Sequence, residues 1–473
     1  MCGSTVEFVR SRMGRALSVC PAVRDRDRLR SEVVEQKMRA KIITVLLLAC
    51  ACLSHSAWAG TNFVAGADFS LLSFFESQGV HYRENGVAKD GLQILKNHGI
   101  NCVRLRLFTS SAAQAAADPY NYINNTNYTV PLAVRVKSAG LQFCLDFHYS
   151  DTWADPGHQA TPAAWTNLGL AALVQQVRSY SSNTVATFAA AGAMPEYVQV
   201  GNEITSGFLW PLGKVFGTGG TPWSQFGQLM KGAIQGIQDA SGTAMPKVIV
   251  HIDRGGDWPT TMWFFDNLNA QGVPYDIIGE SYYTFYQGSP ASLSNCLNNA
   301  AAQYGKPIMI AEDAFPWSSA CPTNWTNSLY GYPPSPAGQV SFMSMVAQTV
   351  KSLPNNLGAG FFYWGTEYQA VSGVAEAGYD TASFFDASGN ILPVADAVGG
   401  MAAPLLLKAA RAGPNVRLQW PFSGAGSKLM TATSAAPAAV WTFVSDSRQT
   451  TDTVFSAAVP MSNRAAIFRL QSN

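Results

Sequence analysis

Eight short apolar segments alternate with amphipathic segments along most of this chain, and each apolar segment ends in polar or aromatic residues. Short apolar runs of this kind predict β-strands, whereas the segments between them, such as DGLQILKNHG and FGQLMKGAIQGIQDA, have helical spacing. Strands that alternate with helices pair in parallel through right-handed crossovers. The apolar segments are FVAGADFS from Phe63, CVRLRLF from Cys102, FCLDFHYS from Phe143, YVQVGNE from Tyr197, KVIVHID from Lys247, YDIIGESYY from Tyr275, PIMIAED from Pro307 and GAGFFYWGTE from Gly358.

This number of strands predicts an α/β fold in which a (β/α)8 barrel, or TIM barrel, occupies residues 60–400. That length suits the usual size of such a barrel. A doubly wound open sheet is the alternative, but it usually has fewer strands and a glycine-rich phosphate turn after the first one. The corresponding stretch here, GADFS from Gly66, is not a GxGxxG motif. We therefore expect the closed barrel.

The composition is that of a folded chain with little electrostatic attraction for polyanions. Of the 473 residues, 47% are hydrophobic and 13% are charged, which provides material for a core and is unlike a disordered chain. The formal net charge of +1 argues against nucleic acid as a partner. We expect a monomer that needs no cofactor and has no membrane span.

The N-terminal region contains a segment typical of a secretory signal peptide. It starts at Met38 with two nearby basic residues, continues with an apolar stretch over 42–53, and ends in the small-x-small pattern AWA before Gly60. The apolar stretch is too short to span a bilayer as a stable helix. We therefore expect residues 38–59 to be removed and the protein to be secreted, into the periplasm or out of the cell.

Two features of this region allow other interpretations. Residues 1–37 are rich in arginine and fit no fold, so we interpret them as a non-native upstream extension; a genuine cytoplasmic extension is the alternative. The sequence LLAC ending at Cys50 resembles a lipoprotein attachment site, but Leu48 is large for its position in such a site. Cleavage after Ala59 is therefore favoured over a lipid anchor.

The cysteines agree with export. Cys102 and Cys144 lie inside apolar strands, where they are expected to pack as small hydrophobic side chains. Cys296 and Cys321 flank the seventh strand, and in an oxidising compartment they are expected to form a disulfide that brackets the turn after it. The sequence contains no CxxC pair and no histidine cluster with metal-ligand spacing, so we expect no metal site.

Polar residues gather at the ends of the predicted strands, which is where barrels of this kind carry their catalytic groups. Individually, many such residues only hydrogen-bond neighbouring strands and loops. Glu203 and Glu312, however, end apolar strands on nearly opposite sides of one barrel mouth, and hydrolysis of a glycosidic bond requires paired carboxylates across a cleft. The strand-end residues are Asp68, Arg104, Arg106, Asp146, His148, Asn202, Glu203, Asp253, Glu312 and Trp364.

These motifs, in this order, resemble glycoside hydrolase family 53, the arabinogalactan endo-β-1,4-galactanases, over about residues 63–398. The most specific piece is DFHYSDTWADPGHQATPAAW from Asp146; the others include GADFSLLSFFESQGVHY, VGNEITSGFLWPLG, VHIDRGGDW, ESYYTFY, AEDAFPW and FFYWGTE. The family belongs to a clan of retaining barrel glycosidases. The resemblance implies that Glu203, which follows Asn202 on the fourth strand, is the acid/base and that Glu312 on the seventh strand is the nucleophile.

The resemblance also implies roles for residues around the two glutamates. Arg104 and Arg106 point to the same side of the second strand, and Arg104 is the one expected beside the nucleophile. Asn202 is expected to donate its amide to the sugar 2-hydroxyl, and Trp364 to form the floor under the sugar at the cleavage point. Other residues are candidates for lining the cleft, with packing as the alternative for each: Arg106, Asp68, Asp146, His148, Tyr149, Trp153 and Trp210.

The chain departs from the family pattern close to these glutamates. The sequence GTEYQ follows Trp364, where an acidic residue, a proline and an aromatic residue are usual. The loop after the eighth strand also lacks a dense run of acidic residues, so we expect no required calcium. These departures leave the exact substrate, the product lengths and the endo or exo habit open. The other changed positions are Arg254, Gly256, Glu280, Thr284 and Asp313.

The pattern changes again near the C-terminus. A connector, MAAPLLLKAARAGPNV, precedes short alternating segments, VRLQWPF, AVWTFVSD and AAIFRLQ, which predict a small all-β accessory module, a β-sandwich, over residues 404–473. Trp420 and Trp441 are expected to fill its core, with stacking on sugar as the alternative.

Three function classes therefore remain. The favoured one is a secreted retaining endo-β-1,4-galactanase acting on the β-1,4-galactan side chains of pectin, also called type I arabinogalactan. The second is another retaining barrel glycosidase acting on a different β-linked polysaccharide, such as a β-mannan. A non-catalytic polysaccharide-binding barrel is disfavoured, because both glutamates, Asn202 and a candidate arginine are all present.

Overall fold

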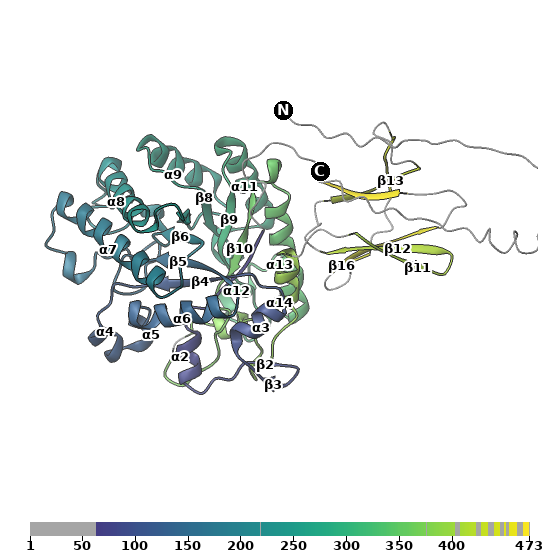
Figure 1. Ribbon diagram of the computed structural model, residues 1–473, viewed down its shortest axis with the longest axis horizontal. Helices are drawn as coiled ribbons and strands as arrows, with labels where there is room; N and C mark the ends of the chain where they lie inside the picture. Colours follow the sequence, from purple (N-terminus) through teal and green to yellow (C-terminus); the bar gives the residue numbers. More distant parts are fainter. Residues whose placement is uncertain are drawn as a thin grey trace, which may run out of the picture. The chain divides into compact units, whose positions relative to one another are not determined.

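The predicted barrel is present. The computed structural model describes residues 63–217, 219–374, 376–402, 407–421, 427–433, 439–444, 449–450, 454–460 and 467–472. Within these residues, eight parallel strands close in the order β1-β10-β9-β8-β7-β6-β5-β4, surrounded by helices (Figure 1). Each corresponds to one apolar segment of the sequence. The strands are β1 (Val64–Asp68), β4 (Cys102–Leu107), β5 (Gln142–Phe147), β6 (Tyr197–Val200), β7 (Lys247–Ile252), β8 (Ile277–Ser281), β9 (Ile308–Asp313) and β10 (Gly358–Tyr363).

The long helices between the strands bury one face each. In α8, for example, the buried residues Phe226, Met230, Ala233 and Ile237 recur at intervals of three or four, which is the spacing of one helical face. The longer helices are α3 (Gly91–Asn97), α6 (Thr126–Ser138), α7 (Leu170–Ala190), α8 (Trp223–Ser241), α9 (Trp258–Ala270), α11 (Pro290–Tyr304) and α13 (Pro336–Lys351). Shorter ones are α2 (Leu72–Ser77), α4 (Ala112–Ala117), α5 (Pro119–Tyr122), α10 (Thr284–Gln287), α12 (Thr323–Thr326) and α14 (Val394–Gly399).

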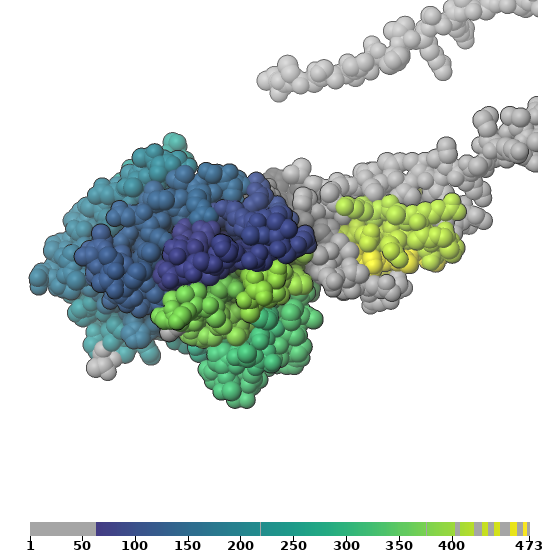
Figure 2. Space-filling model, turned by 90° about the horizontal axis from the view of Figure 1, so that it is seen from below, coloured from purple at the N-terminus to yellow at the C-terminus, as the bar shows by residue number. Residues whose placement is uncertain are grey.

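The barrel closes by pairing its first strand with its last. Val64 of β1 lies opposite Gly360 of β10, and the register continues to Ala67 and Tyr363. A short hairpin of β2 (Arg83–Glu84) and β3 (Val87–Ala88) follows α2, and Arg83 hydrogen-bonds the backbone of the segment before α14. In Figure 2 the purple N-terminal residues accordingly lie beside the light green residues near 390.

The interior of the barrel is apolar toward the N-terminal ends of the strands. One buried cluster takes a residue from every strand: Val64, Cys102, Cys144, Tyr197, Ile249, Ile277, Met309, Ala359 and Phe362. The polar residues at the opposite, C-terminal ends therefore stand on a packed base. Cys102 and Cys144 behave as the small buried side chains that the sequence predicts.

A bulge in β9 determines which of its acidic residues faces the barrel interior. Glu280 of β8 pairs with Ile310, but the next residue, Ser281, pairs with Glu312, so Ala311 is skipped. Met309 belongs to the interior cluster, and strict alternation from it would turn Asp313 inward. The extra residue instead turns Glu312 into the barrel mouth and leaves Asp313 buried outside it. Bulges of this kind are common beside active sites.

The predicted disulfide between Cys296 and Cys321 is not present, because the structure shows both as free thiols. Cys296 lies on the buried face of α11, where its Sγ is 3.5 Å from Thr261 Oγ1 of the neighbouring helix α9. Cys321 lies in the loop before α12. Both cysteines are close to the same strand in the sequence, but this closeness does not determine where their side chains point. The thiol of Cys296 points at α9.

The C-terminal part is all-β, as predicted, although its strands are more numerous. Its described residues form two antiparallel sheets, with the orders β11-β12-β16-β15 and β14-β13-β17. The connector predicted from the sequence includes Lys408–Ala412, which forms a strand. Its residues are largely exposed and show no alternation of apolar and polar side chains that would predict it. The strands are β11 (Lys408–Ala412), β12 (Asn415–Pro421), β13 (Ser427–Ala432), β14 (Thr442–Phe443), β15 (Gln449–Thr450), β16 (Val454–Pro460) and β17 (Ile467–Ser472).

The two tryptophans of this module differ. Trp420 is buried and its ring lies 5.9 Å from that of Phe455, so it fills the core as expected. Trp441 is half-buried, and the guanidinium of Arg469 lies 4.1 Å from its ring centroid. Residues 1–59, with the predicted extension, the signal peptide and Cys50, lie outside the described residues. In the part that is described, no helix is long and apolar enough to cross a membrane.

Candidate active site

A cavity of about 560 Å³ lies at the C-terminal ends of the barrel strands. Glu203 and Glu312 both line it, as the sequence predicts for a pair of catalytic carboxylates. Their neighbours in the lining come from the ends of several strands and the loops that follow them, which is the usual location of active sites in this fold. The other lining residues are Arg104, Arg106, His148, Trp153, Ala154, Asp155, Pro156, Asn202, Asp253, Arg254, Tyr283, Tyr286, Gln287, Trp364 and Tyr379.

Glu203 is held in an unusual backbone conformation directly after β6. Gly201 and Glu203 have φ values of 84° and 50°, in the left-handed region that glycine tolerates and glutamate rarely adopts. A Cβ at position 201 would lie 2.5 Å from Cγ2 of Ile204, so the glycine is also required sterically. The sharp turn ends the apolar strand and exposes the Glu203 carboxyl group to the cavity, where the Ser281 hydroxyl lies 2.6 Å from Oε1.

Glu312 is buried at the end of β9 and held from two sides. Its Oε1 lies 2.9 Å from Nη2 of Arg104, and the Tyr283 hydroxyl donates a hydrogen bond of 3.1 Å to its Oε2. Both contacts favour the ionised carboxylate, and both fix the orientation of the oxygens. The prediction that Arg104 is the arginine beside the nucleophile candidate is therefore consistent with the structure.

The two glutamates have different proton affinities. Burial raises the pKa of Glu203 well above its ordinary value, and the charge of Glu312 raises it further. Burial also raises the pKa of Glu312, to about 7, but there the guanidinium of Arg104 opposes the rise. The first proton to bind the pair therefore resides on Glu203, and Glu312 ionises first. The cavity thus contains one protonated and one ionised carboxyl group, the two protonation states that glycoside hydrolysis requires.

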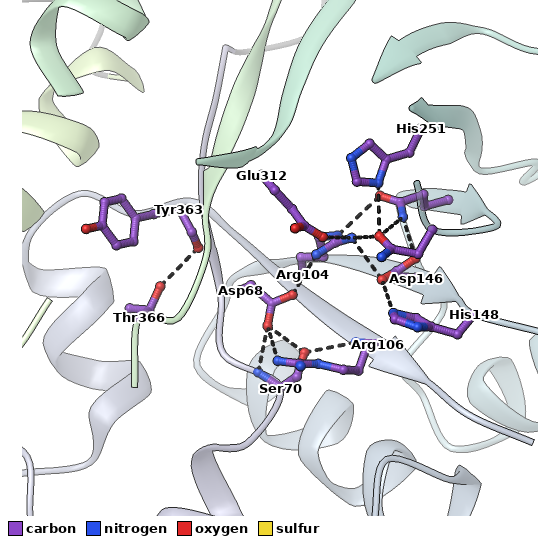
Figure 3. Close-up of polar contacts among 12 residues, drawn as sticks. Asp68, Ser70, Arg104, Arg106, Asp146, His148, His251, Glu312, Tyr363 and Thr366 are labelled. Atoms are coloured by element: carbon purple, nitrogen blue, oxygen red, sulfur yellow. Dashed lines mark hydrogen bonds and ion pairs between the residues drawn. The ribbon is translucent and has the colours of Figure 1, made fainter. Parts of the chain in front are cut away.

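Arg104 is the centre of a buried ionic network (Figure 3). Besides Glu312, it contacts Asp68 through Nη1 at 2.8 Å and Asp146 through Nη2 at 2.9 Å. Its Nη2 also donates to Oδ1 of Asn202 at 2.8 Å. These carboxylates raise its pKa, so the guanidinium stays charged. Breaking such a network from one side costs about 3–5 kcal/mol, because it leaves a buried charge without its partner.

Asn202 is oriented by three donors. Its Oδ1 accepts hydrogen bonds from Arg104, from Nε2 of Gln199 at 3.1 Å and from Nδ1 of His251 at 3.0 Å. Because the oxygen is thereby fixed, the amide nitrogen must face the other way, and it donates to the carbonyl of Ala154 at 2.8 Å. Among the described residues its second N–H has no partner. It is free to donate to a sugar hydroxyl in the cavity.

A chain of hydrogen bonds connects Glu203 to Asn202. The Ser281 hydroxyl lies between Oε1 of Glu203 and Nε2 of His251, 2.8 Å away, and the other ring nitrogen of His251 faces Asn202. Burial lowers the pKa of His251 well below its ordinary value, so the ring is neutral and donates through Nδ1. The Ser281 hydroxyl, whose proton is donated to Oε1 of Glu203, thus links the carboxyl group to a neutral His251 ring.

The predicted cleft residues fall into two groups. Arg106, His148, Trp153 and Trp364 line the cavity with the glutamates. The Arg106 guanidinium lies 4.2 Å from the Trp153 ring centroid and 5.6 Å from that of Trp364, so these side chains form one wall. Asp68 and Asp146 do not line the cavity. They lie buried beneath it, where Asp68 pairs with both arginines and Asp146 accepts from Arg104, Gln199 and His148.

Trp210 is a correction to the sequence prediction, because it is not among the residues that line the cavity. Its indole nitrogen donates to the backbone carbonyl of Ser206 at 3.1 Å. The ammonium of Lys214 lies 4.5 Å from its ring centroid. Trp210 therefore packs on the loop after β6 and does not face the sugar site. Tyr149 is likewise buried, with its hydroxyl 2.8 Å from Ser181 Oγ of helix α7.

Several contributors to the site were not predicted: Gln199, His251, Ser281, Tyr283 and Tyr379. Gln199 and His251 are polar residues inside otherwise apolar strands, and this break in the apolar pattern could have identified them as site residues. Ser281 and Tyr283 lie in ESYYTFY, one of the motifs that carry the family resemblance, but that resemblance alone predicts no role for them. In the described part of the chain, no group of three or more His, Cys, Asp or Glu side chains has an arrangement that could hold a metal ion.

Comparison with known proteins supports a glycosidase site. The family described as glycosyl hydrolase family 53 matches residues 64–398. A probable arabinogalactan endo-β-1,4-galactanase A of Neosartorya fischeri is 35% identical over 336 residues, covering 69% of this chain and 90% of the relative. An arabinogalactan endo-β-1,4-galactanase of Humicola insolens is 36% identical over 307 residues, covering 63% and 88%.

Two solved structures are also similar to this chain. A fungal β-1,4-galactanase structure has a TM-score of 0.63 at 33% identity and covers 70% of this chain and 98% of its own. The family 53 catalytic domain of Ignisphaera aggregans has a TM-score of 0.66 at 30% identity and covers 75% and 98%. The resemblance therefore extends to the complete barrels of these proteins.

Proposed function

Because the chain belongs to glycosyl hydrolase family 53 and is a glycoside hydrolase, we propose that it is a retaining endo-β-1,4-galactanase that hydrolyses β-1,4-galactan by double displacement. The observation that carries this proposal is the pair Glu203 and Glu312, which share one cavity but have opposite protonation preferences. The galactanase relatives, matched over most of their length, support galactan as the substrate.

In the first step of the proposed reaction, the ionised Glu312 attacks the anomeric carbon from the face of the sugar opposite to the leaving oxygen. The bond from that carbon to the leaving oxygen breaks, and the oxygen takes the proton of Glu203. The products are a covalent glycosyl-enzyme with inverted configuration and a released sugar chain. Glu203 is then ionised and accepts from the Ser281 hydroxyl.

In the second step, Glu203 takes a proton from water, and the water oxygen attacks the anomeric carbon. The bond to Glu312 breaks, so the second inversion restores the β configuration and regenerates both carboxyl groups. Arg104 and Tyr283 stabilise the Glu312 carboxylate as it leaves, because both contact its oxygens. The free N–H of Asn202 is assigned to the 2-hydroxyl, and Trp364 to the face of the sugar.

We expect a bell-shaped dependence of kcat/KM on pH. Activity requires ionised Glu312, so it should fall as the pH drops below the pKa of about 7 of that group. It also requires protonated Glu203, so it should fall again above the raised pKa of that group. The apparent values belong to the coupled pair. Initial rates on soluble galactan across acidic and alkaline buffers check this, and a rate that rises continuously with pH would contradict it.

The substrate is tested by measuring reducing-sugar release from debranched galactan, arabinogalactan, mannan and cellulose in parallel. The proposal predicts release from galactan above all others, with oligosaccharides among the early products, as an endo-acting enzyme gives. Release from mannan or cellulose alone would instead favour another retaining barrel glycosidase. The changed residues Arg254, Glu280 and Asp313 near the site would then be the first positions to examine.

We also propose that the protein is secreted as a monomer through the signal peptide that begins at Met38. The small residues at Ala57 and Ala59 then determine cleavage, so the exported protein should begin at or near Gly60. N-terminal sequencing of the exported protein checks this. An exported protein that starts at residue 2, or one that carries lipid on Cys50, would contradict it.

A further inference from the structure

The charges of this chain are distributed very unequally, although its formal net charge is only +1. Residues 60–403, which contain the barrel, have 14 lysines and arginines but 23 aspartates and glutamates, a formal net charge of −9. Residues 404–473, which contain the C-terminal module, have seven basic and two acidic residues, a formal net charge of +5. The near-zero net charge of the whole chain therefore conceals a basic module, and such a module attracts acidic partners.

Two of the basic side chains of the module project from one face of a sheet. The strands β11, β12 and β16 lie side by side (Figure 1). Arg417 of β12 lies directly opposite Ala410 of β11 and Ala458 of β16. Residues directly opposite each other share a face of the sheet, as do residues two apart on one strand. Lys408 is two residues from Ala410, so Lys408 and Arg417 lie on the same face, here called the basic face.

The basic face is turned away from the hydrophobic core. Leu418 and Trp420 alternate with Arg417 and Gln419 on β12 and are buried. Lys408 and Arg417 are exposed, and so are the two alanines opposite Arg417, whose methyl groups are too short to cover its guanidinium. Aspartate and glutamate are absent from the described residues of the module, 407–421, 427–433, 439–444, 449–450, 454–460 and 467–472. Within these ranges no carboxylate neutralises the basic face.

Protection of a sheet edge explains only part of this charge. β11 is the edge strand of its sheet, and a lysine such as Lys408 discourages pairing with another chain. Arg417, however, lies on β12, which is paired with a strand on both sides. A cation in that position protects no edge. Arg411, which is exposed near the turn between β11 and β12, adds a third positive charge to the same hairpin.

We propose that the basic face of the C-terminal module binds an acidic polysaccharide, whose sugars carry carboxylate groups at regular intervals. Lysine and arginine form charge-assisted hydrogen bonds with carboxylates. A flat sheet face with several cations can contact more than one sugar of an extended chain. The barrel, with its negative net charge, is repelled by such a polymer, so the attraction comes from the module.

The choice of a polysaccharide over nucleic acid or an anionic membrane rests on the proposed function. Galactan side chains of pectin are attached to a backbone that contains uronic acids, so an acidic polymer accompanies the substrate. Binding to that backbone keeps the barrel near the side chains and raises the effective concentration of galactan.

Affinity electrophoresis of the full exported protein through gels that contain polygalacturonate tests the proposal. The polymer should retard the protein, and added salt should remove the effect by screening exposed charges. In Lys408→Gln with Arg417→Gln, the dissociation constant should rise about three- to tenfold, because each exposed ion pair contributes modestly. Glutamate at both positions should abolish retardation. Fully methyl-esterified polygalacturonate, which has the same backbone without the charge, should not retard the wild type.

Lys96→Gln with Lys231→Gln serves as the matched control, because it removes two exposed lysines from the barrel and changes the net charge equally. It should bind polygalacturonate like the wild type. An equal loss in both pairs of variants, or undiminished retardation of the charge-reversed variant, would overturn the proposal. So would binding to the methyl-esterified polymer as tight as to the charged one. Tighter binding to DNA or to anionic phospholipid vesicles than to polygalacturonate would also overturn it.

Binding and catalysis are measured separately, so their failures can be distinguished. Hydrolysis of free galactan should be the same in the wild type and in these variants, because Lys408 and Arg417 lie outside the barrel. A wild type that is retarded by polygalacturonate but releases no sugar from galactan would refute the proposed function. A wild type that cleaves galactan but is not retarded would refute the role of the basic face alone.

Discussion

Replacing Glu312 with Gly should abolish hydrolysis of galactan, lowering kcat by about 10⁴-fold or more, as expected when a catalytic nucleophile is removed. The carboxylate is the only protein group in the proposed reaction that attacks the anomeric carbon, and water attacks only after the glycosyl-enzyme has formed. Arg104 and Tyr283, which now contact it, supply donors and no nucleophile. The loss should appear in kcat, because most of the contacts that bind the sugar remain.

Asp313→Asn is the matched control for this variant. Asp313 is the next residue and also a buried carboxyl group, but the bulge in β9 leaves it outside the barrel mouth. Burial raises its pKa well above the ordinary value, so it is already neutral and Asn is close in shape and charge. Activity should stay within a few-fold of the wild type. If Asp313→Asn were inactive and Glu312→Gly active, the assignment of the nucleophile would be wrong.

Added azide should restore turnover of an activated aryl β-galactobioside by Glu312→Gly. The small anion fits the space left by the carboxylate and attacks the anomeric carbon directly. A single inversion then gives the α-galactosyl azide. Recovery of this product would show that the lost group acted from the side opposite to the leaving group.

Replacing Glu203 with Ala should have a different signature. On galactan, kcat should fall by about 10²–10⁴-fold, the usual contribution of a general acid, because the leaving sugar oxygen must then depart without a proton. An activated aryl leaving group needs little protonation, so Glu312 should still form the glycosyl-enzyme. Its hydrolysis would lack the general base and become slow. A fast burst of aryl release followed by slow turnover, measured by rapid mixing, checks this.

Azide should accelerate turnover of Glu203→Ala as well, because azide needs no base to attack the glycosyl-enzyme. Two inversions then give the β-galactosyl azide, the opposite anomer from that of Glu312→Gly. Identification of the two azides by proton NMR therefore distinguishes the two roles. An α-azide from Glu203→Ala would mean that the roles are reversed.

The barrel and the two glutamates could be predicted because they depend on local patterns. Each strand is a short apolar run with its own polar end, and the motif VGNEIT contains the glycine that its turn requires. Which of Glu312 and Asp313 faces the cavity could not be derived from alternation, because the register shift in β9 reverses it. The resemblance to a family gave the correct residue, whereas the period-two rule alone would have favoured Asp313.

The errors and omissions share one cause. Contacts such as that of His251 with Asn202, or of Ser281 with Glu203, join residues from different strands and depend on the stagger of the closed barrel. A single sequence shows that these residues are polar but not which of them meet. For the same reason the sequence offers Trp210 as a candidate for lining the cleft, although the structure packs it on the loop after β6. It also predicts a disulfide between two cysteines that the structure shows as free.

The most direct measurement of the central claim is the configuration of the first sugar that the wild-type enzyme releases. Proton NMR spectra recorded through the first minutes of galacto-oligosaccharide hydrolysis follow the new anomeric signals as they appear. Attack by Glu312 followed by attack of water activated by Glu203 predicts that the β anomer appears first and that the α anomer grows in later by mutarotation. Initial release of the α anomer would contradict the double displacement and, with it, the roles assigned to both glutamates.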